Sequence, residues 1–180
     1  MNKKYFLFIL FCALSSCGFH AIYNGDNISN SSSNAESKAE DYKQKLAAIT
    51  IKSQKKHIDQ KLKNNLEELL NPYNIKTEPR YILTTSLTKS LGGTFTTSSG
   101  AVGRNRLILN VTYDLKDLNS GETVSFGTVI AKDDFDVSTT RFANYTAEEA
   151  IEINLTKIVA GNIRDRLVND LRTNPKSTPW

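Results

Sequence analysis

Apolar residues recur at helical spacing in two stretches of the chain, and each stretch predicts an amphipathic helix. In the first stretch the apolar positions are Ile58, Leu62, Leu66, Leu69 and Leu70. Asp59 suits the first turn of this helix, because an acidic side chain is stabilised at the positive end of the helix dipole. Asn71-Pro72 should end the helix, since proline lacks the backbone N–H and disfavours helix in the residue before it.

The second predicted helix is longer and closes the chain. Thr146, followed three residues later by Glu149, forms a capping box, which predicts that the helix begins there. Its apolar positions step by four residues: Ala147, Ile151, Leu155, Val159, Ile163, Leu167 and Leu171. Both helices therefore need an apolar surface to pack against.

Four strands are predicted around these helices, mostly from alternating apolar and polar residues. The first is the short apolar run 46–51, the second covers 81–88, and the third, 107–115, alternates most cleanly, with its odd positions expected to face the core. Val124, Phe126, Thr128 and Ile130 begin a fourth strand, antiparallel to the third, which continues with a bend at Asp133-Asp134.

This order, β-α-β-β-β-α, predicts an α+β fold, a two-layer sandwich with two helices packed on one face of a mostly antiparallel four-stranded sheet. The other face would be exposed or covered by a partner. It would carry Asn110, Thr112, Asp114 and Lys116.

Residues 92–103, between the second and third strands, are rich in glycine and hydroxyl side chains and predict a mobile loop. Phe95 and Val102 are its only sizeable apolar residues. A loop of this kind is either a partner-binding tip or a hairpin end with no further role.

The first residues of the chain have the pattern of an export signal with a lipidation site. Lys3 and Lys4 precede an apolar run of about ten residues, too short for a membrane-spanning helix, which needs about 20. The following Leu14-Ser15-Ser16-Cys17 resembles a bacterial lipobox. We therefore expect Cys17 to carry an N-acyl group and an S-diacylglycerol, which together anchor a protein stably. An ordinary secreted protein with a chance cysteine is the alternative.

The composition changes along the chain divide it into four parts. Residues 1–16 are the predicted signal peptide, 17–45 a lipidated N-terminus and flexible tether, 46–172 the folded domain, and 173–180 a disordered tail. Cys17 is the only cysteine outside the leader, so no internal disulfide is expected.

Charge and chemistry exclude several classes of function. The net charge is +4 and falls to +2 without the two leader lysines, which is too little for a nucleic-acid-binding protein. His20 and His57 have no motif-spaced cysteine or carboxylate beside them, so neither a metal site nor a cofactor is expected. We expect the chain not to be an enzyme.

Several segments together resemble the LPS-assembly lipoproteins (LptE, also called RlpB), particularly the alphaproteobacterial branch. The similar segments are Cys17-Gly18-Phe19, 103–107, 113–117, 135–138 and 142–145. The resemblance covers most of residues 17–171, and no single motif in it is decisive. The chain departs from the family pattern at Thr139-Thr140-Arg141 and in its long tether.

The resemblance implies the same two-layer sandwich and a role at the cell outer membrane. There the lipid-anchored domain would plug the barrel of the LPS translocon protein LptD and help to insert lipopolysaccharide into the outer leaflet. It also implies direct lipopolysaccharide binding. Arg104, Arg106 and, more weakly, Lys89 could then contact lipid phosphates, with a solvated strand end as the alternative.

Two other classes of function remain open. The chain could be a structural or pilot lipoprotein of another envelope machine, such as a secretin or a barrel-assembly complex. Crosslinking from Phe95 in the predicted barrel-contact loop would discriminate between these partners. A lipid-anchored hydrolase would need His57 against a serine and a carboxylate.

Overall fold

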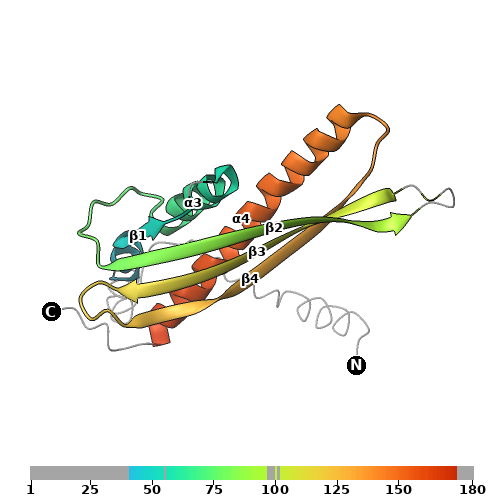
Figure 1. The fold of residues 1–180 in the computed structure, drawn as a ribbon. Coiled ribbons are helices and arrows are strands. Elements are labelled where there is room, and N and C mark those ends of the chain that lie inside the picture. Colours follow the sequence, from blue (N-terminus) through green and yellow to red (C-terminus); the bar gives the residue numbers. More distant parts are fainter. Residues whose placement is uncertain (1–40, 55, 97–99, 101, 174–180) are drawn as a thin grey trace, which may run out of the picture. The chain divides into compact units, whose positions relative to one another are not determined.

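The computed structural model describes residues 41–54, 56–96, 100 and 102–173. The predicted signal peptide, Cys17, most of the predicted tether and residues 174–180 of the predicted tail lie outside these residues. All described elements belong to the unit Glu36–Trp180. They are a short helix over 41–47, β1 (Ile49–Lys52), α3 (His57–Leu70), β2 (Tyr81–Thr96), β3 (Val102–Asp117), β4 (Thr123–Asp136) and α4 (Arg141–Thr173) (Figure 1).

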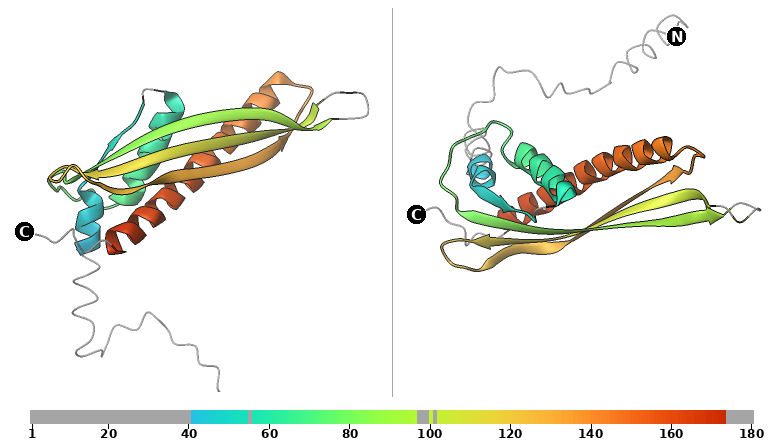
Figure 2. Two further views of the ribbon diagram at one scale, coloured as in Figure 1. Left: turned by 60° about the horizontal axis from the view of Figure 1, so that its bottom comes forward. Right: turned by 45° about the horizontal axis from the view of Figure 1, so that its top comes forward.

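The four strands form one mixed sheet in the order β1-β2-β3-β4. β1 pairs with β2 in parallel, and the other neighbours are antiparallel. Both helices α3 and α4 lie on the same face of this sheet (Figure 2). The predicted α+β class is therefore confirmed. Two features add to the prediction: the β1–β2 pair is parallel, and a short helix over 41–47 precedes β1. Residues 41–45 of this helix belong to the stretch assigned to the tether.

The core lies between the helices and the odd positions of the long strands, as the alternation predicts. Tyr81 and Leu83 of β2 and Leu107 through Leu115 at odd positions of β3 are buried. They pack in one cluster with Leu62, Leu66, Leu70, Leu155, Val159, Ile163 and Leu167 of the helices. The apolar stripes of the two helices thus pack against each other and against the sheet.

The β2–β3 hairpin is longer than the sequence predicts. The expected loop at 92–103 is largely strand: β2 reaches Thr96, which pairs with Val102, and the register shifts around Phe95. The glycines of this segment give no alternating pattern from which a strand could be predicted. Pairing with β3 nevertheless extends β2 through it. A register shift beside a glycine is typical of a β-bulge.

The residues of β4 that predict the strand, at even positions, are not the ones that it buries. Ser125, Val129, Ala131 and Phe135 are buried, whereas Phe126 and Ile130 are 78% and 62% exposed. β4 also runs without a break through the predicted bend at Asp133-Asp134. The register of β4 against β3 decides which face each residue takes.

α4 begins earlier than the capping box suggests. It starts at Arg141, so Thr146 lies inside the helix and its hydroxyl donates to the carbonyl of Phe142. The side-chain amide of Asn144 holds the chain before the helix in place. Its oxygen accepts a hydrogen bond from the Ser138 N–H, and its nitrogen donates one to the Ser138 carbonyl. This local hydrogen bonding explains the earlier start.

Candidate functional site

One face of the sheet carries no helix among the described residues (Figure 2). Residues opposite each other in the register share a face, so this open face collects the even positions of the three long strands over most of their length. Its side chains are mostly hydroxyls and amides: Thr84, Ser86, Thr88, Asn110, Thr112 and Thr128. Phe126 and Ile130 are the exposed apolar exceptions.

Two arginine–aspartate pairs lie across β3 and β4 at the far end of the open face. Arg106 makes two hydrogen bonds to Asp134, at 2.6 and 2.8 Å, and Arg104 bonds Asp136 at 2.8 Å. The hydrogen bond from Arg106 holds the pKa of the Asp134 carboxyl below its usual value, although desolvation acts in the opposite direction. Both pairs are open to solvent at their outer side.

The structure brings three of the predicted contact residues together. Phe95 is the register partner of Arg104 and is 60% exposed, so it lies beside the arginine pairs. Val102 pairs with Thr96 in the same hairpin, but its side chain lies outside the described part of the structure. Contacts of these residues with lipopolysaccharide or a barrel remain predictions.

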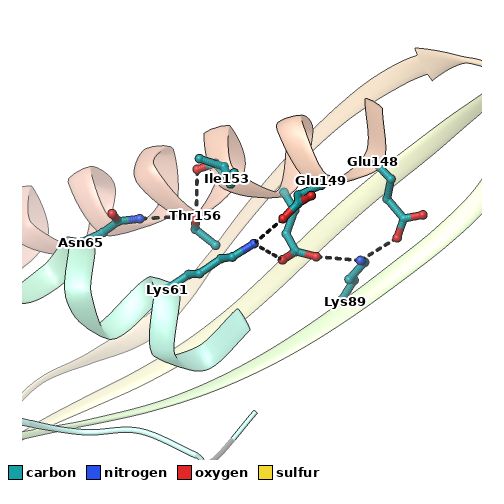
Figure 3. Close-up of polar contacts among 8 residues, drawn as sticks. Lys61, Asn65, Lys89, Glu148, Glu149, Ile153 and Thr156 are labelled. Atoms are coloured by element: carbon teal, nitrogen blue, oxygen red, sulfur yellow. Dashed lines mark hydrogen bonds and ion pairs between the residues drawn. The ribbon is translucent and has the colours of Figure 1, made fainter. Parts of the chain in front are cut away.

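Lys89, the third predicted cation, lies elsewhere, among acidic residues of α4 (Figure 3). Its Nζ is 2.6 Å from a Glu148 oxygen and 2.7 Å from a Glu152 oxygen. Lys61 of α3 reaches Glu152 at 3.3 Å and Glu149 at 3.7 Å. We call these five residues the ion-pair cluster. It joins β2, α3 and α4.

The charges in the cluster stabilise one another. Burial of Glu152 opposes ionisation, yet hydrogen bonds and charge from Lys89 and Lys61 hold its pKa below the usual 4.5. Burial likewise disfavours the charged form of Lys89, but Glu148 and Glu152 raise its pKa above 10.5. Lys89 is therefore held as a cation by protein partners.

The sequence did not predict this cluster. Its residues come from three elements, and Lys61 and Glu152 are 91 positions apart. The acidic run at 148–152 was the available signal, but the capping box explained it locally. His57 and Tyr145 line the same shallow depression.

The described residues show no group of three or more His, Cys, Asp or Glu side chains placed to hold a metal ion. In the same residues, no helix combines the length and the apolar character that a membrane span requires. The side chains around His57 are lysines, glutamates and a tyrosine.

Sequence comparisons find no matching family model and no matching curated protein. Solved structures do match. A protein of Caulobacter crescentus described as a lipoprotein superposes with a TM-score of 0.60 at 16% identity, covering 74% of this chain and 97% of its own. Rare lipoprotein B from Shewanella oneidensis gives a TM-score of 0.56 at 15% identity, covering 69% and 96%.

The chain has the fold of these lipoproteins. Lipoprotein B of Nitrosomonas europaea shares it as well, with a TM-score of 0.53 at 16% identity over 70% of this chain and 83% of its own. The three matches cover 69–74% of this chain and 83–97% of each solved chain. At these identities the likeness concerns the fold.

Proposed function

We propose that this chain is a lipid-anchored subunit of the outer-membrane LPS translocon, a member of the LptE family and of its alphaproteobacterial branch. In this role it plugs the LptD barrel, assists its assembly and helps to insert lipopolysaccharide into the outer leaflet. The proposal rests on one combination: the sequence at Cys17 resembles a lipobox, and the chain has the fold of rare lipoprotein B. Acyl chains on Cys17 would hold the domain at the membrane.

The open face of the sheet supports a place inside a barrel. Barrel interiors are polar, so a plug needs a polar surface rather than an extended apolar patch. The hydroxyl and amide side chains of the open face supply such a surface across three strands. Phe95 extends beyond it at the end of the β2–β3 hairpin, as a barrel-contact residue would.

The arginine pairs are the proposed phosphate contacts. Arg104 and Arg106 keep exposed guanidinium surface while bound to Asp136 and Asp134. A phosphate could share or replace the aspartate, because both anions accept the same pair of parallel N–H donors. Lys89 is a poorer candidate, since Glu148 and Glu152 already surround its ammonium group.

Depletion of the protein in its native cells tests the proposal. We expect lipopolysaccharide to stop reaching the cell surface and the LptD barrel to be lost from its assembled form. Re-expression of the wild-type chain should restore both, whereas Cys17→Ser should not. Unchanged surface lipopolysaccharide after depletion would contradict the proposed function.

Crosslinking from Phe95 separates this proposal from the alternative one. A photo-reactive residue at Phe95 should crosslink to the LptD barrel. Capture of a secretin or of a barrel-assembly component would instead support the pilot-lipoprotein function. Tyr73, which is exposed in the segment between α3 and β2, is the matched control position.

A further inference from the structure

β4 forms one edge of the described sheet, and in the described part of the chain no strand pairs with its outer side. Val137 donates its N–H to Gly103 of β3, so odd residues at this end of the ladder point toward β3. In an antiparallel pair the intervening residues point away. Between Ser125 and Asp136 the pairing is regular, so the N–H and carbonyl groups of Phe126, Thr128 and Ile130 face the free edge.

A hydrogen bond from α4 confirms this direction. The Arg166 guanidinium donates to the Thr128 carbonyl at 2.9 Å. This contact agrees with an outward-facing Thr128 carbonyl, which is the direction that the register gives. The contact also shows that the Arg166 face of α4 lies along the β4 edge.

Over its first part, from Thr123 to Ala131, β4 carries no charge of its own that would oppose strand pairing, and Arg166 of α4 covers the Thr128 carbonyl there. Exposed edge strands are normally short or carry charges, prolines or bulges. β4 has 14 residues, and none of the residues from Thr123 to Ala131 is charged. Phe126 and Ile130 also present exposed apolar side chains beside the same stretch of edge.

The helix supplies a second surface for an added strand. Ile158, Asn162 and Arg166 follow one another at four-residue spacing and so share one face of α4. Ile158 is 46% exposed, and Arg166 places this face at the β4 edge. An added strand would therefore meet Phe126 and Ile130 on one side and the flank of α4 on the other.

We propose that the β4 edge from Phe126 to Ile130 binds an extended segment of a partner protein as a fifth strand. The segment would carry apolar residues on the side of Phe126 and Ile130. On the other side it would carry a carboxylate that pairs with Arg166 once a backbone N–H takes over the Thr128 carbonyl.

The charge of Arg166 decides between a foreign segment and a second copy of this chain. Two copies paired about Thr128 would place both Arg166 guanidiniums at the same position, and the like charges would repel. A segment with an acidic residue opposite Arg166 has the complementary charge. Pairing of two copies about Thr128 is therefore disfavoured, and an acidic segment of another protein is the occupant that we propose.

The test uses the full-length, lipidated chain in its native cells with photo-reactive benzoylphenylalanine in place of Phe126. We expect a crosslink to one segment of another protein. Peptide mapping should show alternating apolar residues and an Asp or Glu within that segment. The same residue at exposed Tyr73 is the control and should not capture it.

Edge variants show whether the captured segment pairs with β4. Thr128→Pro removes an outward N–H, and Ile130→Lys places a charge at the edge. Each should reduce the crosslink at least tenfold. Asn110→Lys adds the same charge opposite Ile130 on β3, away from the edge, and should keep the crosslink. Arg166→Glu, which changes the helix and not the strand, should also reduce it.

Circular dichroism and thermal unfolding verify that each variant is folded. If Thr128→Pro does not fold, Arg166→Glu takes its place in the test. Crosslinks only to a second copy, to residues 18–40 of the same chain or to lipid would overturn the proposal. So would a crosslink that survives both edge variants and Arg166→Glu. The proposal does not depend on lipopolysaccharide transport, because it concerns the pairing and not the identity of the partner.

Discussion

Asp59 is a fully buried carboxyl in the first turn of α3, and in the described part of the chain neither of its oxygens has a close hydrogen-bond partner. Burial raises its pKa above the usual 3.8, although the nearby charge and backbone N–H of Lys56 act in the other direction. Ionisation of Asp59 is therefore less favourable in the folded state than in the unfolded chain. At neutral pH the ionised carboxylate lowers the stability of the domain.

This gives a prediction for Asp59→Asn. A neutral amide avoids the burial of a charge, so the variant should be more stable at pH 7 by on the order of 1 kcal/mol. The gain should shrink as the pH falls through the raised pKa of Asp59, because the wild-type carboxyl then becomes neutral too. Urea unfolding at pH 7 and pH 4 measures this. A loss of stability at pH 7 would contradict it.

Gly127 is a second residue with a specific role, because the Tyr113 side chain lies over it. A Cβ atom at Gly127 would be 3.1 Å from the Tyr113 hydroxyl oxygen and 3.2 Å from a ring carbon. Since Tyr113 is buried, its ring has little room to move. Gly127→Val should destabilise the domain by about 1–3 kcal/mol through overpacking. Thr128→Val on the exposed face is the control and should change the unfolding midpoint little.

At the scale of elements, the ion-pair cluster fixes the N-terminal part of α4 to α3 and β2. Glu152 is its central group, because it contacts both Lys61 and Lys89. The lowered pKa of Glu152 means that its stabilisation is lost as the pH falls through that value, below about 4.5. The raised pKa of Lys89 means that its stabilisation is lost only above about 10.5. Between these limits the cluster should hold.

Glu152→Gln should therefore loosen one end of α4. We expect faster hydrogen exchange of the amides at 145–152 at neutral pH and a stability loss of about 1 kcal/mol, the upper range for partly exposed pairs. Glu67→Gln removes the exposed pair with Lys63 on α3 and should leave those amides unchanged. Equal exchange in both variants would show that packing alone holds the helix.

The elements differ in how far the sequence predicts them. The stripe of α3 and the odd positions of β3 gave both the element and its buried face, because apolar residues dominate one side of each, with Asp59 the buried exception on α3. β4 has apolar residues at even and odd positions, so only its register with β3 sets its face. The ion-pair cluster was not predictable, since Lys61, Lys89 and Glu152 meet only in the folded chain.

For the whole molecule, the described domain has a core of its own. Among the described residues, the core cluster runs from Leu46 to Leu171, within the unit Glu36–Trp180. The stability of this core should therefore not depend on the predicted anchor. The anchor should decide only where the protein resides, because acyl chains contribute about 0.8 kcal/mol per buried CH₂ to membrane binding.

Cys17→Ser separates the two contributions. The variant lacks the thiol that lipidation needs, so we expect it to leave the membrane fraction of native cells while the wild-type chain stays there. Its purified domain should unfold at the same temperature as the wild type, because the described core is formed by residues 46–171. Ser16→Ala, which keeps a small residue before the cysteine, should remain membrane-bound. If Cys17→Ser stayed in the membrane fraction, a contact other than acyl chains would hold the domain there.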